Sequence, residues 1–277
     1  MNLFHFIHRS KDILLTIVIA LFALAAENFL LFHIAAEGIT IVIGIIFIIK
    51  VYKIRETYSN SLMILLGCAL LAVGLIDFLH VITYFGMEVP IRDSANKSTQ
   101  LWIAGRYVLS ISFLLAPFFL KRKYPGYYFY LVYALVSSII LGAIFLSETI
   151  PACLTEDKGL TNFKIYNEYI IIAIFFFALA HFYGNRKLID RNCFVGTQVA
   201  LIIFIVSEIC FILYMQVYSV VNILGHMLKV LAYVYVYYGL VLHEPNIFRR
   251  KHFLSKPLLK KPSTKQNYHR IYKIKRR

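Results

Sequence analysis

Eight apolar segments, each close to the length of a membrane-spanning helix, follow one another through this chain of 277 residues. A helix needs about 20 apolar residues to cross the hydrocarbon core, whereas a transmembrane β-strand shows about ten residues of alternating polarity. Since every backbone polar group in lipid must be paired internally, each segment is predicted to be helical. The sequence therefore predicts an all-α, polytopic transmembrane bundle of about eight spans. We place them at about 13–32, 34–52, 61–85, 100–120, 127–147, 165–183, 194–216 and 220–242.

The composition and the helix breakers agree with this division. Only 16% of the residues are charged, against about 25% in typical soluble domains. Prolines fall mostly between the segments, as at Pro90 and Pro151. Pro117 lies near the end of the fourth segment, where we expect it to kink or end the helix.

Basic residues predict the orientation, because short loops rich in Lys and Arg stay in the cytoplasm. One set of alternating connections holds eleven of them: Arg9, Lys11, Lys50, Lys53, Arg55, Lys121, Arg122, Lys123, Arg186, Lys187 and Arg191. The opposite set holds only Arg92, Lys97, Lys158 and Lys164. With an even number of spans, we expect both termini in the cytoplasm.

The chain is thus divided into a cytoplasmic segment (1–12), a membrane-embedded bundle (13–245) and a basic cytoplasmic tail (246–277). Twelve of the 29 Lys and Arg lie between Arg249 and Arg277. Basic residues just beyond a span bind anionic lipid headgroups, so we expect the tail to contact the bilayer and not nucleic acid. The four cysteines form no CxxC pattern and predict no disulfide framework.

The first segment has a second interpretation. Ala23-Leu24-Ala25 is similar to a signal-peptide cleavage site, and cleavage would leave seven spans in the same orientation. Because the apolar run continues past this site through Phe29–Phe32, we expect an uncleaved first helix.

Ionisable side chains at membrane depth are costly, so they face the bundle interior and mark function. There are ten: Glu27, His33, Glu37, Asp77, His80, Arg106, Glu168, Glu208, His226 and Lys229. The alternating topology places all ten in the outer half of the membrane. Spacings of three or four put His33 with Glu37, Asp77 with His80, and His226 with Lys229 on shared helix faces. We predict a polar cavity that is open to the exterior and lined by this set without Glu27.

Such residues admit several chemistries. They can bind a small polar ligand, take part in proton sensing, or serve only as ion pairs that fix helix register, with Arg106 pairing with Asp77 or Glu168 and Lys229 with Glu208. Nitrogen and oxygen ligands also suit a transition metal, and two histidines could ligate haem. The metal candidates are His80, His226, Asp77 and Glu37. There is no GxSxG and no Gly-rich phosphate loop, so no enzyme activity is predicted.

The two long exterior connections, 86–99 and 148–164, are expected either to form a cap or to be plain solvated links.

Several separated strings occur in the order of a known family: LFHIAAE (31–37), IDFLHVITYFGM (76–87), QLWIAGRY (100–107), APFFL (116–120), GLTNFKIYNEYI (159–170) and NILGHMLKV (222–230). Over about residues 13–245 the chain resembles the membrane-associated sensor domains of the third MASE type. The resemblance implies a multi-helix input module of bacterial signalling proteins, one that usually precedes PAS, histidine-kinase or diguanylate-cyclase domains. The nine cavity residues correspond to the polar positions of that family.

The resemblance and the polar set together predict a sensory input module in the bacterial plasma membrane. It would detect an extracytoplasmic or membrane-dissolved signal and relay it to a cytoplasmic signalling protein. A second copy of the chain, forming a homodimer, is a further candidate partner. Where that family continues into an output domain, this chain ends in the basic tail, so it signals through a partner or is a remnant of a longer receptor. The alternative function is a small-solute transporter or a haem- or metal-binding membrane oxidoreductase that uses the same cavity.

Overall fold

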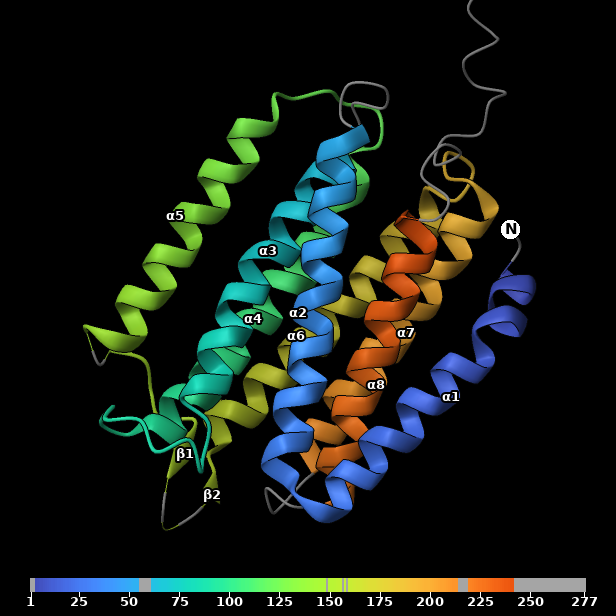
Figure 1. Cartoon of the computed structure of the whole chain (residues 1–277). Helices are drawn as coiled ribbons and strands as arrows, with labels where there is room; N and C mark the ends of the chain where they lie inside the picture. The colour runs from blue at the N-terminus through green and yellow to red at the C-terminus, as the bar shows by residue number, and fades with distance from the viewer. Residues whose placement is uncertain are drawn as a thin grey trace, which may run out of the picture.

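A computed structural model describes residues 3–54, 61–147, 149–155, 157, 159–213 and 219–241, and it describes side chains from residue 15 on. The chain forms an all-α bundle, as expected (Figure 1). Its α-helices are α1 (Leu3–Glu27), α2 (Phe29–Ile54), α3 (Ser61–Ile82), α4 (Ser94–Leu115), α5 (Gly126–Phe145), α6 (Asn162–Gly184), α7 (Arg191–Leu213) and α8 (Val220–Val236). Seven segments within the described residues, from α2 to α8, are long and apolar enough to cross a membrane. The basic tail, 246–277, lies outside the described residues.

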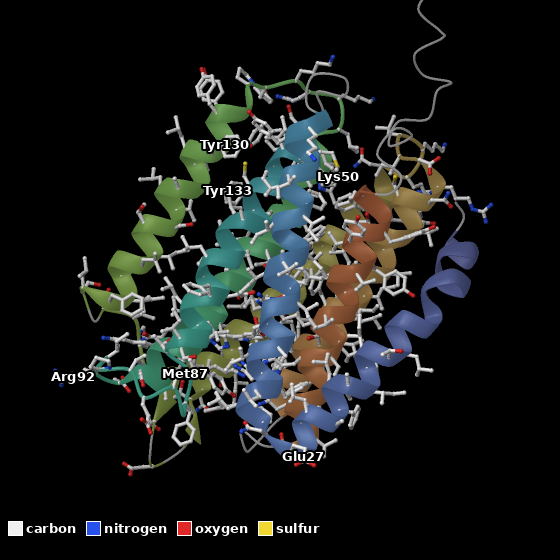
Figure 2. The ribbon with its side chains drawn as sticks, viewed as in Figure 1. Glu27, Lys50, Met87, Arg92, Tyr130 and Tyr133 are labelled. Atoms are coloured by element: carbon white, nitrogen blue, oxygen red, sulfur yellow. The ribbon has the colours of Figure 1, made fainter. Side chains whose placement is uncertain are left out.

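The helices run up and down between two ends. One end holds Glu27 and the α3–α4 connection with Met87 and Arg92, and we call it the Glu27 end (Figure 2). The other holds Lys50 and the α4–α5 connection, and we call it the Lys50 end (Figures 1 and 2). α8 starts at the Glu27 end and continues into a π-helical turn, η2 (Tyr237–Val241), at the Lys50 end.

The predicted boundary between the first two spans is wrong by several residues. α1 ends at Glu27 and α2 begins at Phe29, because Asn28 separates them. The Asn28 side chain accepts a hydrogen bond from the backbone N–H of Leu31 at 3.0 Å, which caps the first turn of α2. His33 and Glu37 therefore lie in the second and third turns of α2, deeper in the bundle than the sequence suggests.

A proline ends α4 as predicted. α4 stops at Leu115 and is followed by a 3-10 helix, η1 (Ala116–Phe119), which contains Pro117. Proline removes a helical hydrogen bond and clashes with the preceding turn, so the α-helix cannot continue through it.

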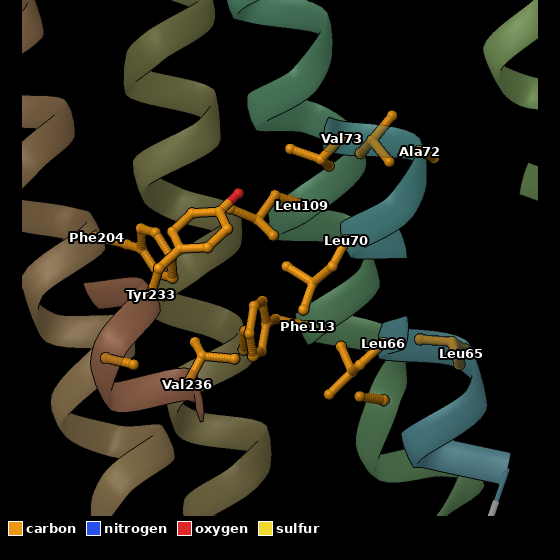
Figure 3. Close-up of a cluster of buried hydrophobic side chains, with 14 of the residues drawn as sticks. Leu65, Leu66, Leu70, Ala72, Val73, Leu109, Phe113, Phe204, Tyr233 and Val236 are labelled. Atoms are coloured by element: carbon orange, nitrogen blue, oxygen red, sulfur yellow. The ribbon is translucent and has the colours of Figure 1, made fainter. Parts of the chain in front are cut away.

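The apolar core lies between α3, α4, α7 and α8. Leu109 and Phe113 of α4 face Phe204 of α7 and Tyr233 of α8 (Figure 3). α3 closes the cluster from the other side and is buried along most of its length. α5 stands at the edge of the bundle, against α3, and most of its surface is left for lipid (Figure 1).

Glycines bring α7 and α8 into close contact. A Cβ at Gly196 would lie 2.7 Å from the Cα of Gly239, and a Cβ at Gly225 would lie 2.8 Å from the Phe211 ring. The Ser207 hydroxyl donates to the Gly225 carbonyl at 2.8 Å. Small residues at such positions let two membrane helices pack backbone to backbone.

The second long connection at the Glu27 end docks onto the first turn of α4. A short antiparallel hairpin pairs β1 (Leu154–Thr155) with β2 (Gly159–Leu160). The Asn96 side-chain oxygen accepts hydrogen bonds from the backbone N–H groups of Cys153, at 2.8 Å, and Leu154. These hydrogen bonds hold the 148–164 connection against the start of α4, which favours a cap over a plain solvated link for this connection.

Candidate functional site

The nine candidate residues are all buried, with exposures of 0–4%. They come from six helices: α2 supplies His33 and Glu37, α3 Asp77 and His80, α4 Arg106, α6 Glu168, α7 Glu208, and α8 His226 and Lys229. The histidines lie nearer the Glu27 end than the charged residues on the same helices. At 1.5 Å per residue, Glu37 is about 12 Å along α2 from Phe29, close to the middle of a ~30 Å hydrocarbon core.

Four charged side chains meet at the centre and pair with one another; we call them the charge network. Lys229 Nζ lies 2.5 Å from Glu37 Oε2 and 2.9 Å from Asp77 Oδ2. Arg106 Nη2 donates to both Asp77 carboxylate oxygens at 3.1 Å. Two carboxylates and two cations from four helices thereby share one buried cluster, and such charges are tolerated in low dielectric only when they are paired.

Arg106 has an ion-pair partner that the sequence predicted, whereas Lys229 has different partners. Arg106 pairs with Asp77, one of the two partners expected from the sequence. Lys229 pairs with Glu37 and Asp77 and not with Glu208, because the face of α8 that carries Lys229 packs against α2. Gly105 leaves room for this cluster, since a Cβ there would lie 3.3 Å from Asp77 Oδ1.

Three histidines lie beside the charge network. His33 Nε2 is 3.2 Å from His80 Nε2, and the ring centroids of His33 and His226 are 4.9 Å apart. His80 Nδ1 is 2.8 Å from the Ser98 carbonyl oxygen, and His226 Nδ1 is 2.9 Å from the Asn222 carbonyl oxygen. A carbonyl only accepts, so both Nδ1 atoms carry hydrogen and both Nε2 atoms present a lone pair.

A second charged cluster lies between α6 and α7. Lys164 Nζ is 2.7 Å from Glu168 Oε1 and also donates to the Phe211 carbonyl. Glu208 is buried in α7, and its Oε2 has no hydrogen-bond partner within the part of the chain described. Glu168 and Glu208 are therefore not brought into direct contact with the histidines or with Glu37.

Sequence reasoning missed two residues of this site. Lys164 was assigned to an exterior loop, yet it is 1% exposed because α6 begins earlier, at Asn162. The signal was Thr161, whose side chain caps the helix by accepting from the Lys164 backbone N–H. Trp102 was not singled out, although its ring lies 4.7 Å from both the Arg106 guanidinium carbon and Lys229 Nζ. An aromatic face at that distance stabilises a desolvated cation.

The expected open polar cavity takes a packed form here. Beside His80 and His226 is a cavity of about 30 Å³, which Tyr84, Trp102 and Phe211 also line. That is room for about one water molecule. The four side chains of the charge network lie directly against oppositely charged partners and so leave little space between them.

A second cavity, of about 750 Å³, lies elsewhere and has a different character. It is an apolar groove between α2, α3 and α5, lined by residues such as Ile45, Leu71, Phe78 and Tyr130. Its walls are almost entirely hydrocarbon, so the groove suits an apolar occupant. It does not touch the charge network.

His33 and His80 do not fit a haem sandwiched between them. Two axial nitrogens of one iron lie on opposite faces of a macrocycle, about 4 Å apart, whereas His33 Nε2 and His80 Nε2 are 3.2 Å apart with nothing between them.

A single metal ion matches the residues of this site better than haem does. One ligand atom each from His33, Glu37 and His226 lies within 4.8 Å of the other two. Of the four metal candidates read from the sequence, Glu37 and His226 are in this group, whereas Asp77 is paired with Arg106 and Lys229, and His80 is bonded to Ser98 and His33.

The comparisons with known proteins agree with the resemblance of the sequence motifs. No curated protein and no solved structure matches the chain. A family model described as membrane-associated sensor domain, MASE3, matches residues 24–244. That range covers every candidate residue and all of α2 to α8. The chain therefore belongs to the MASE3 family of membrane-associated sensor domains.

Proposed function

We propose that this multi-pass membrane sensor detects an extracytoplasmic or membrane-dissolved signal at the charge network and its histidines, and relays it along α8 to the Lys50 end. The observation that carries the proposal is the path of α8. This helix contributes His226 and Lys229 to the site and runs without interruption into η2 at the opposite end of the bundle. A change in the ion pairs of Lys229 would therefore move α8, and α8 would carry this movement to the Lys50 end.

The charge network has the form of a two-state element. Lys229 is shared between two carboxylates, and Asp77 is shared between two cations. A signal that binds or neutralises one of these groups changes which ion pairs form. The helices then have two packing arrangements, one for each set of ion pairs. The signal shifts the equilibrium between them by as much as its affinity for the two arrangements differs. α2, α3, α4 and α8 are all tied to the network, so the shift reaches four helices.

The close packing of α7 and α8 favours joint movement. Backbone contact at Gly196 and Gly239, with Phe211 against Gly225, fixes the two helices along their length. Interlocked helices move as a unit, because packed interfaces switch between discrete arrangements instead of deforming continuously.

The orientation follows from the basic loops. We infer that the Glu27 end faces the exterior and the Lys50 end the cytoplasm of a bacterial cell, since the connections rich in Lys and Arg, such as the one at Lys121–Lys123, join helices at the Lys50 end. The readers of the signal would be a cytoplasmic signalling protein and the anionic lipids that contact the basic tail. This is a binding and relay function, without a catalytic step of its own.

Hydrogen exchange of the whole protein in lipid nanodiscs tests the relay. Glu37→Gln and Asp77→Asn each remove one charge from the network without changing side-chain shape. We expect altered backbone protection both around the network and in η2. His181→Gln is the matched control, because His181 bonds to the Leu114 carbonyl at 2.8 Å, away from the network. A change confined to residues next to the substitution would contradict a relay through α8.

A further inference from the structure

Three residues that lie close together in this site each carry a buried polar atom with no partner in the described part of the structure. His33 Nδ1, Glu37 Oε1 and His226 Nε2 have no hydrogen-bond partner among the residues described, and their side chains are 0%, 0% and 4% exposed. These same three residues each place one ligand atom within 4.8 Å of the other two. Buried polar atoms are nearly always satisfied, so a cluster of three exceptions calls for an explanation.

The hydrogen bonds around the cluster fix which atoms are acceptors. His80 gives its Nδ1 hydrogen to the Ser98 carbonyl, so its Nε2 accepts, and His33 Nε2 must donate to it across 3.2 Å. His33 Nδ1 is then left as an acceptor. His226 gives its Nδ1 hydrogen to the Asn222 carbonyl, so its Nε2 is also an acceptor, 3.6 Å from the acceptor Glu37 Oε1. Acceptors do not satisfy one another, whereas a cation between them satisfies all three.

We propose that His33, Glu37 and His226 bind one divalent transition-metal ion. The inference rests on the proposed function and deepens it, because the ion is the group through which the charge network meets the signal. Two imidazole nitrogens and one carboxylate oxygen suit Zn²⁺, Fe²⁺ or Co²⁺ and not Mg²⁺ or Ca²⁺, which prefer oxygen ligands. In this proposal the signal is the metal ion itself or a small molecule bound to it.

The distance between two of the ligand atoms is close to that expected around a bound ion. With bonds of about 2.0–2.1 Å, two ligands of a tetrahedral ion lie roughly 3.3 Å apart. Glu37 Oε1 and His226 Nε2 are 3.6 Å apart. The cavity of about 30 Å³ borders His226 and leaves room beside this ligand for about one water molecule.

The residues around the ligands act as supports for them. Metal-binding histidines commonly donate their second nitrogen to a carbonyl or another acceptor, which orients the ring. His226 does so to Asn222 and His33 to His80. Glu37 is held through its other oxygen by Lys229, which leaves Oε1 pointing toward the two histidines.

Cobalt titration of the whole protein in mild detergent, after removal of metal with a chelator, tests the site. Co²⁺ is the probe because its visible absorption reports coordination directly. We expect one Co²⁺ per chain, displaced by Zn²⁺, with affinity at least about 100-fold weaker in His226→Ala and Glu37→Gln. His181→Ala, a histidine outside the cluster, should bind as the unchanged protein does.

A second substitution keeps the test independent of folding defects. His226→Cys leaves the charge network intact and should retain Co²⁺ while adding an absorption band from thiolate-to-cobalt charge transfer. Absence of stoichiometric Co²⁺ and Zn²⁺ from the unchanged protein, or equal binding by His226→Ala, would overturn the site. Hydrogen exchange of η2 with and without Zn²⁺ separates the two proposals: binding without a change in η2 supports the metal site and counts against the relay.

Discussion

Lys229→Met is the substitution that most directly measures what the charge network contributes. Methionine keeps the length and the apolar stem of lysine but removes the ammonium group. That group donates to Glu37 Oε2 at 2.5 Å and to Asp77 Oδ2 at 2.9 Å, and it lies 4.7 Å from the Trp102 ring. Asp77 keeps Arg106 as a partner, whereas Glu37 loses its closest cation.

The expected loss is large. A hydrogen bond to a charged group contributes about 1.5–3 kcal/mol, and two are lost. Removing one partner of a buried ion pair costs about 3–5 kcal/mol, which agrees with that total. Since each 1.4 kcal/mol is tenfold, the unfolding equilibrium should shift by more than about 100-fold. The measurement is the free energy of unfolding in mixed micelles of mild detergent and SDS.

The double variant with Glu37→Gln identifies the source of that loss. Neutralising the Glu37 carboxylate, which has lost its cation, should recover more than half of the lost free energy of unfolding, because the unpaired buried charge is what destabilises the fold. Lys53→Met, in the exposed last turn of α2, is the control and should be close to neutral. A loss below about 1 kcal/mol for Lys229→Met, or a double variant as damaged as the sum of its parts, would refute the pairing described here.

Three further predictions concern packing, the cap and orientation. Gly196→Ala places a Cβ 2.7 Å from the η2 backbone and should lower the free energy of unfolding by about 1–3 kcal/mol, whereas Gly142→Ala, with nothing within 4 Å, should not. Burial raises the pKa of the Cys153 thiol from 9.0 to about 12, so maleimide should label it slowly in native protein and rapidly after unfolding. Because the unfolded chain loses that proton first, stability should be intact below pH 9 and fall as pH rises from 9 toward 12. In intact cells, an impermeant reagent should label Arg92→Cys and not Tyr52→Cys; the reverse would invert the proposed orientation.

Much of the fold could be predicted from hydropathy alone. Apolar runs of the right length specify helices in lipid because no other structure pairs the backbone there, and Pro117 marked the end of α4 correctly. The boundary at Asn28 could not be found that way, because both flanks are apolar and only the Asn28 cap separates α1 from α2. The same weakness hid Lys164, whose burial depends on where α6 begins.

The candidate site could be predicted as a set of residues but not as a set of contacts. Charge at membrane depth selected all nine buried positions, because an ionisable group in lipid must turn inward. Which cation meets which carboxylate depends on how the helices rotate against each other. A spacing of three or four residues along one helix carries no information about the neighbouring helix, and so Lys229 was paired with Glu208 instead of Glu37 and Asp77.

This site has two halves that differ in whether their polar groups are satisfied: the charge network, and the group formed by His33, Glu37 and His226. The charge network satisfies itself, so it can hold a fixed helix arrangement without any ligand. The acceptors of His33, Glu37 and His226 do not, because each histidine has already given its hydrogen elsewhere. Glu37 belongs to both halves: one oxygen holds Lys229 and the other faces the histidines. A cation bound by the histidines must therefore draw on the same carboxylate that anchors α8, and this shared residue is the physical link between occupancy of the site and the position of the helix.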